Sequence, residues 1–329
     1  MKQGFYMGYD ASLLGEDALR RQARLLLDTG LYRAGYRTLR LGRVERFDAP
    51  EKLAASLRAL GFQLDFTVAP EAGVDGVAER IQALGAGMLT IDGSDREAAR
   101  NLAAAFAGKL RVAVAAEDAA EWAGDCADVA ELNVIQEDDD FFEITRNRLD
   151  SCRDGDTDVA RSDANLRRAA MGAGGAWSAG NLPLRFDMYR NQAIFMQTAI
   201  LGCPLVLAGD IAELPGETLA LLTCEPILRM AKAGPGGVAR YYDPWHALLT
   251  KPARDGATWA LILNRCHGDQ PTNLLPADLG WEGRFSLRQL PEDRLVGANL
   301  ETFEAHLETS DHPETPCCGL YLAERIRKI

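Results

Sequence analysis

The chain has 329 residues, of which 47% are hydrophobic and 26% charged, so its length suits one large domain plus a small one in a folded soluble protein. Asp and Glu total 48 against 36 Lys and Arg, which gives a formal net charge of -12. This balance argues against a nucleic-acid partner, because affinity for a phosphate backbone depends on clustered positive charge, and it suits a neutral ligand such as a sugar.

The seven cysteines are odd in number and form no Cys-x-x-Cys pair, so we expect neither a metal site nor a cofactor. Adjacent Cys317 and Cys318 could form a strained vicinal disulfide, but two reduced thiols are the preferred interpretation. The first residues show no signal-peptide pattern, and no run approaches the ~20 apolar residues of a membrane span. We therefore expect a cytoplasmic protein without a membrane partner.

Short extended runs alternate with amphipathic helical runs over the first two-thirds of the chain. Most of the extended runs recur at the length of a strand, a helix and two turns. The predicted strands, in chain order, are Gly4–Tyr9, Thr38–Leu41, Gln63–Val68, Met88–Ile91, Leu110–Ala115, Val129–Ile135, Ala176–Leu182 and Pro204–Ala208. The predicted helices between them include Gly15–Thr29, Pro50–Leu60 and Val77–Leu84, each followed by a glycine.

Eight strand–helix units predict an α/β fold, a (β/α)8 TIM barrel, whose typical length is about 250 residues. A doubly wound open sheet would show the same alternation. Eight units favour a closed barrel, and no Gly-x-Gly-x-x-Gly follows the first strand as a dinucleotide fold would require. The polar, turn-rich segment Ser151–Asp158 indicates a barrel distorted at its seventh unit.

The pattern changes near Gly234, where alternating runs punctuated by Asp, Gly and Pro replace the helical ones. Examples are Trp259–Asn264, Phe285–Leu290 and Gly319–Leu322. These runs predict a C-terminal antiparallel β-sandwich. We therefore expect a barrel over residues 1–234 and a β-sandwich domain over residues 235–329.

Two segments resemble a known family. Residues 187–210 read DMYRNQAIFMQTAILGCPLVLAGD, and residues 25–42 read LLLDTGLYRAGYRTLRLG. Both are similar to clan D glycoside hydrolases, the α-galactosidases and α-N-acetylgalactosaminidases, and the resemblance covers nearly the whole chain. It implies a TIM barrel with a β-sandwich, retaining hydrolysis of an α-glycoside, a small carbohydrate or glycoside as ligand, and barrels that often form homo-oligomers.

Chemistry in a TIM barrel takes place where the strands end. Strand four ends Met88-Leu-Thr-Ile-Asp92, so this carboxylate is expected at the barrel mouth, either as a nucleophile or as a cap of the next helix. The segment resembles the family's Leu-Leu-Lys-x-Asp-Gly, which makes Asp92 the counterpart of the nucleophile. Thr90 stands where the family has lysine.

The ends of strands five and six supply the other acidic candidates. The resemblance matches Glu117 with a glutamate that holds sugar hydroxyls, although an acid at a helix start would also fit. It places Gln136 at the position of the general acid/base, where glutamine has no proton to give. A slip of one residue brings Glu137 into that role, while the acidic run that begins there could equally be a solvated helix start.

Two further strand ends depart from the family pattern. After strand two the family has paired acids that grip sugar hydroxyls, whereas this chain has Gly42 and Arg43. Arg43 indicates an anionic group, or else a salt bridge with Glu45 or Asp92. After strand seven Trp177 could stack on a sugar or be buried, and Asn181 replaces an acid as a candidate ligand of the substrate.

Two functions follow from these strand ends. The first is an active α-glycoside hydrolase with Asp92 as nucleophile and an acid near Glu137 as proton donor. The second is a non-catalytic descendant that binds a carbohydrate or a protein. The four histidines all follow residue 245, outside the predicted barrel, so neither Ser-His-Asp catalysis nor a metal site is supported.

Overall fold

The structure is a computed structural model that describes the greater part of the chain. The described residues are 5–69, 74–106, 108–115, 127, 129–131, 188–202, 204–208, 210–234, 236–242, 246–264, 270–307 and 317–326. They fall into two compact units. The first unit contains a parallel sheet, and the second contains antiparallel sheets with three helices. The domain boundary after residue 234 stays a prediction.

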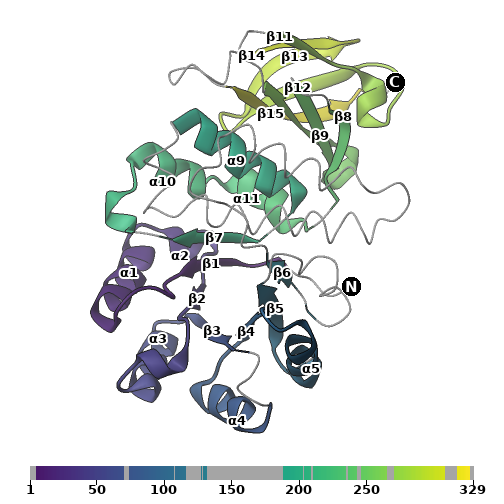
Figure 1. Cartoon of the computed structure of the whole chain (residues 1–329). Coiled ribbons are helices and arrows are strands. Elements are labelled where there is room, and N and C mark those ends of the chain that lie inside the picture. Colours follow the sequence, from purple (N-terminus) through teal and green to yellow (C-terminus); the bar gives the residue numbers. More distant parts are fainter. Residues whose placement is uncertain are drawn as a thin grey trace. The chain divides into compact units, whose positions relative to one another are not determined.

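The parallel sheet of the first unit has the strand order of a barrel (Figure 1). Its strands are β1 (Met7–Asp10), β2 (Thr38–Arg40), β3 (Gln63–Val68), β4 (Met88–Asp92), β5 (Arg111–Ala115), β6 (Val129–Glu131) and β7 (Leu205–Ala208). They lie in the order β6-β5-β4-β3-β2-β1-β7, all parallel. A doubly wound sheet would reverse its order at a switch point, whereas here the last strand pairs with the first. The fold is a TIM barrel, as predicted.

These seven strands overlap seven of the eight predicted ones. The eighth, Ala176–Leu182, lies outside the described residues, as does the predicted distortion at Ser151–Asp158.

The helices that follow these strands lie on the outer side of the sheet (Figure 1). They are α1 (Glu16–Asp28), α2 (Leu31–Ala34), α3 (Pro50–Ala59), α4 (Val74–Leu84) and α5 (Arg96–Phe106), with a short 3-10 helix η1 (Val44–Arg46) after β2. Leu19, Ala23 and Leu26 of α1 are buried, because the spacing of three and four residues puts them on one face. The predicted start of α4 at Val77 was wrong, since the helix begins at Val74.

The second unit is a β-sandwich accompanied by helices. One sheet has the order β13-β12-β15-β10-β9-β8, and a two-stranded sheet pairs β11 with β14. The strands are β8 (Val238–Tyr242), β9 (His246–Pro252), β10 (Thr258–Asn264), β11 (Gln270–Leu274), β12 (Phe285–Leu290), β13 (Arg294–Leu300), β14 (Phe303–Leu307) and β15 (Cys318–Arg325). Phe285 and Ile262 of the large sheet share a buried core with Leu274 and Leu307 of the small one. The predicted antiparallel sandwich is therefore confirmed.

Among the described residues of this second unit there are three α-helices: α9 (Met188–Leu201), α10 (Gly216–Leu222) and α11 (Glu225–Lys232). Helix α9 contacts β9, β10 and β15, as well as the other two helices. Lys251 of β9 is buried and donates to the carbonyl of Met230 in α11 at 2.7 Å. Cys317 and Cys318 are buried thiols that form no disulfide. No helix in the described ranges combines the length and apolarity that a membrane span needs.

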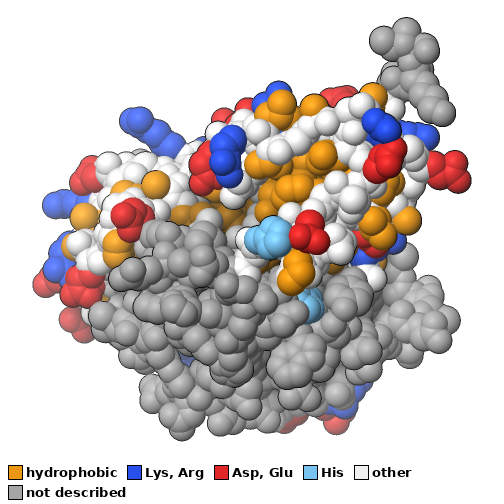
Figure 2. All heavy atoms as spheres, turned by 90° about the horizontal axis from the view of Figure 1, so that it is seen from above, with side chains coloured by type: hydrophobic (Ala, Val, Ile, Leu, Met, Phe, Trp, Pro, Cys, Tyr) orange, Lys and Arg blue, Asp and Glu red, His pale blue; other side chains and the backbone are white. Residues whose placement is uncertain are grey.

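Hydrophobic side chains reach the molecular surface shown in Figure 2, with acidic and basic side chains around them. Among the described residues of the second unit, Leu275 and Leu295 are 44% and 53% exposed. Scattered exposed apolar side chains are ordinary on protein surfaces, so they identify no binding face.

Asp210 ties the turn after β7 to helix α1. Its Oδ1 accepts from Gln22 Nε2 at 2.7 Å and from the backbone N–H of Ala212 at 3.0 Å, and its Oδ2 accepts from Arg21 Nη2 at 2.6 Å. Gln22 Oε1 in turn accepts the N–H of Ile211 at 3.0 Å. The hydrogen bond from Gln22, followed by those from Ala212 and Arg21, holds the pKa of Asp210 below its ordinary value of 3.8.

A carboxylate with a lowered pKa stabilises the folded state above its unfolded pKa and loses that contribution as the pH falls through its folded pKa. We expect Asp210→Asn to lower the free energy of unfolding by about 1 kcal/mol at neutral pH, because charge-assisted hydrogen bonds are lost. The difference should shrink as the pH falls below 3.8 and vanish once it is below the lowered pKa of the folded state. Urea unfolding of both proteins across this range measures it, and a deficit that persists at the acid end would contradict the assignment.

Candidate functional site

Asp92 is the last residue of β4, so its carboxylate emerges at the C-terminal end of the barrel strands. Its side chain is 39% exposed. The cap of helix α5 is Asp95, whose Oδ1 accepts the N–H groups of Glu97 and Ala98, each at 3.1 Å. Asp92 Oδ1 accepts the N–H of Ser94, two residues on, at 3.1 Å. The capping role that competed for Asp92 thus belongs to its neighbour.

Arg43 follows β2 and lies beside Asp92. Its Nη2 is 3.6 Å from Asp92 Oδ2, and its side chain is 55% exposed. Glu45, the other salt-bridge partner that the sequence allows, pairs with Arg80 at 3.1 Å. The structure thus brings together Arg43 and Asp92, two residues predicted for the site from different strand ends. Their separation exceeds hydrogen-bond length and both are solvated, so the pair is weak.

An ion-pair network lies one layer deeper in the barrel. Asp10, Arg40 and Asp65 are register neighbours on β1, β2 and β3, so their side chains lie on the same face of the sheet. Arg40 Nε donates to Asp65 Oδ2 at 2.8 Å, and Arg40 Nη1 lies 3.8 Å from Asp10 Oδ2. Asp65 is fully buried, and the side chain of Arg40 is 11% exposed. A buried guanidinium thus bridges two carboxylates.

Thr90 and Tyr6 complete this network. Thr90 Oγ1 lies 2.9 and 3.0 Å from the two oxygens of Asp65, and Arg40 Nη2 donates to Tyr6 Oη at 3.0 Å. Thr90, at the position where the resemblance has lysine, therefore gives its hydroxyl to the barrel interior. Burial raises the pKa of Asp65, while the Arg40 guanidinium and the Thr90 hydroxyl oppose that rise.

This network was not predicted from the sequence. Asp65 interrupts Leu64 and Phe66, and Arg40 interrupts Leu39 and Leu41, so each is a lone charge in an apolar strand. In a barrel whose strands are covered by helices, such a charge has to face the interior or an end. That signal marks each residue singly, but the register that pairs Arg40 with Asp65 comes from the structure.

Five predicted site residues lie outside the described part of the chain: Glu117, Gln136, Glu137, Trp177 and Asn181. Their roles stay predictions. Among the described residues, no group of three or more His, Cys, Asp and Glu side chains could hold a metal ion.

No protein-family model matches the chain, and no curated protein matches it. Solved structures do. A β-L-arabinopyranosidase of glycoside hydrolase family 27 from Geobacillus stearothermophilus superposes with a TM-score of 0.76 at 14% identity, covering 98% of this chain and 97% of that one. The chain has the fold of the clan D glycosidases.

Two α-galactosidases share the fold over similar lengths. α-Galactosidase I from Mortierella vinacea gives a TM-score of 0.73 at 12% identity, covering 98% of this chain and 97% of that chain. The enzyme from Saccharomyces cerevisiae gives 0.71 at 12% identity, covering 99% and 98%. The likeness covers nearly the whole of this chain and shows a shared fold. Identity at this level shows the fold and leaves activity to the site.

Arg40, the last residue of β2, should contribute far more to the free energy of unfolding than Arg43, which follows the strand. Arg40→Met leaves Asp65 buried without its cation and should cost about 3 to 5 kcal/mol, whereas Arg43→Met removes a solvated ion pair and should cost less than about 1 kcal/mol. Urea unfolding at neutral pH measures both.

The double variant Arg40→Met/Asp65→Leu is the control for the buried pair. It removes both charges and should recover most of the loss, because an apolar pair of similar volume leaves no unpaired charge behind. Equal costs for the two single arginine variants would show that the Arg40 network does not carry this energy.

Proposed function

We propose that the chain binds a carbohydrate at the C-terminal end of the barrel strands and hydrolyses an α-glycoside with retention of configuration. The observation that supports this is the position of Asp92: a half-exposed carboxylate that ends β4, relieved of helix capping by Asp95. The shared fold with the clan D glycosidases supports the reaction class.

In this mechanism Asp92 attacks the anomeric carbon as the glycosidic carbon–oxygen bond breaks. The leaving oxygen takes a proton from an acid, for which Glu137 is the candidate, and the sugar stays bound to Asp92 as an ester. Water then attacks the same carbon, the acid residue takes a proton from that water, and Asp92 leaves as a carboxylate. Asp92 thus acts through covalent catalysis, and the second acid only moves protons.

The charge of Arg43 indicates which kind of substrate the mouth would bind. Its half-exposed guanidinium lies at the mouth beside Asp92, where the resemblance has acids that grip neutral hydroxyls. A guanidinium binds carboxylate and phosphate groups in a bidentate manner. Because the ion pair with Asp92 is weak, little free energy is lost when an anionic group of the substrate replaces Asp92 as the partner of Arg43. We therefore propose a glycoside that carries an anionic group in preference to a plain galactoside.

A non-catalytic carbohydrate-binding barrel is the second candidate, and the same ion pair favours it. A cation beside a carboxylate nucleophile stabilises its negative charge and so makes it less reactive toward the anomeric carbon. Thr90 adds to this, because its hydroxyl is engaged by the buried Asp65 and is turned from the mouth. In this case the site binds a sugar and performs no chemistry on it.

Activated aryl α-glycosides separate the two functions, because their leaving groups need little protonation. Under the proposal, rapid mixing should release a burst of aryl alcohol in proportion to the enzyme, and Asp92→Asn should abolish it. Asp95→Asn is the matched control: it removes a neighbouring carboxylate, and asparagine still caps the helix, so the burst should remain.

Aryl glucuronides and aryl galactosides test the preference for an anionic sugar in the same assay. Arg43→Met should reduce the rate for the glucuronide more than for the galactoside. If the wild-type protein releases no aryl alcohol from any of these compounds yet binds the parent sugars in a titration, hydrolysis is ruled out and the non-catalytic function stands.

A further inference from the structure

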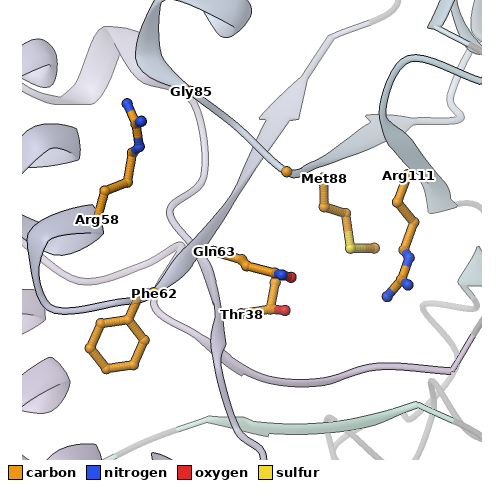
Figure 3. A pocket seen from close by; sticks show the side chains of 8 residues that line it. Thr38, Arg58, Phe62, Gln63, Gly85, Met88 and Arg111 are labelled. Carbon is orange, nitrogen blue, oxygen red and sulfur yellow. The ribbon is translucent and has the colours of Figure 1, made fainter.

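A cavity of about 430 Å³ opens at the opposite end of the barrel strands from Asp92 (Figure 3). Its lining includes Thr38, Gln63, Met88 and Arg111, the first residues of β2, β3, β4 and β5. Arg58, Phe62, Gly85 and Gly87 complete it. Met88 begins the strand that Asp92 ends, so about 13 Å of β4 separates their Cα atoms. The volume lies in the range of pockets that hold small molecules.

The lining of this cavity is basic. The described residues that line it include two arginines and no acidic residue, in a chain whose acids outnumber its bases by 12. In the described part of the chain, no carboxylate lies within ion-pair distance of Arg58 or Arg111. Arg111 Nη1 donates to the carbonyl of Phe5 at 3.3 Å, and its guanidinium carbon lies 6.0 Å from the ring centre of Tyr6. Neither of these two contacts supplies a negative charge to the Arg111 guanidinium.

Arg58 lies at the rim of the cavity, across from Arg111. Figure 3 shows the two guanidinium groups on opposite sides, with Thr38 and Gln63 between them. Gly85, at the end of α4, has φ +67°, and a Cβ there would approach Arg58 Nη1 to 2.3 Å. The positive φ favours glycine at this position. The absence of a side chain there also leaves room for the guanidinium of the exposed Arg58 beside the cavity.

Guanidinium groups with no carboxylate beside them select oxyanions, which they bind through parallel N–H donors. Thr38 and Gln63 add a hydroxyl and an amide, which hydrogen-bond neutral hydroxyl groups. Positive charge at two sides with neutral donors and acceptors between them fits a ligand that is anionic at one end and hydroxylated along its length.

We propose that this cavity is a binding site for a small hydroxylated organic anion, with a phosphate or carboxylate held by Arg58 or Arg111 and hydroxyls held by Thr38 and Gln63. The site is separate from the mouth that carries Asp92 and Arg43, and its existence does not depend on the function of that mouth. Its ligand is a phosphorylated or acidic sugar or a compound of the same chemistry.

Isothermal titration with four probes tests the site: inorganic phosphate, glucose 6-phosphate, gluconate and glucose. Glucose 6-phosphate or gluconate should bind at least about tenfold tighter than glucose, since a charge-assisted hydrogen bond contributes about that much. Tighter binding of the phosphate compounds identifies a phosphate head, and tighter binding of gluconate identifies a carboxylate. Raising the salt concentration should weaken binding in either case.

Arg58→Gln and Arg111→Lys should each weaken the bound probe about tenfold or more, because glutamine has no charge and lysine has no planar fork. Arg24→Gln, an exposed arginine of α1 outside the cavity lining, is the matched control and should leave affinity unchanged. Repeating the titrations in Arg43→Met removes the cation of the mouth, so that binding which persists belongs to the cavity.

Three results would overturn the proposal: no anionic probe binds at millimolar concentration, glucose binds as tightly as its charged derivatives, or both cavity variants retain wild-type affinity. Circular dichroism of each variant shows whether it is folded, and Arg58→Gln should be, since this side chain is exposed.

Discussion

The pairing of Arg40 with Asp65 is the constraint around which the described half of the barrel is arranged. A charge inside a barrel that excludes water is tolerated only when an opposite charge and hydrogen bonds satisfy it. Asp65 is fully buried and takes Arg40 on one side and Thr90 on another. Barrel interiors are ordinarily filled by bulky aliphatic side chains, whereas this one contains a layer of charged and polar side chains. Tyr6 and Asp10 complete that layer at the remaining donors of Arg40.

The register extends this layer across five strands. Asp10 neighbours Arg40, Arg40 neighbours Asp65, Asp65 neighbours Met88, and Met88 neighbours Arg111. Asp10 is the last residue of β1, whereas Arg111 is the first residue of β5, because barrel strands are staggered by their tilt. One row of inward side chains therefore runs from the mouth that carries Asp92 to the cavity at the other end. The two candidate sites thus lie at the two ends of the same row of inward side chains.

Much of the fold follows from the sequence, because extended runs alternate with amphipathic helical runs, and glycines mark where helices end. The site follows less well. The sequence identified Asp92 and Arg43 as residues of the mouth but left the partner of Arg43 open, since the turn at Gly42 and η1 decides where that side chain points. The buried pair of Arg40 and Asp65 and the basic cavity were not predicted from the sequence, for a related reason. Each is assembled from neighbouring strands, and only register, which a strand pattern does not encode, brings such residues to one depth.

The backbone at Gly42 explains why an acid does not fit at this position of the mouth without a change in the loop. Its φ is +74°, a conformation that disfavours aspartate, and a Cβ there would lie 2.9 Å from the carbonyl oxygen of Ser12. Restoring the acid that the resemblance places at this position would require the loop after β1 to move. The backbone that admits glycine also leads directly into Arg43, whose guanidinium then reaches Asp92. Gly42 and Arg43 thus belong to one loop conformation, which sets a positive charge beside the candidate nucleophile.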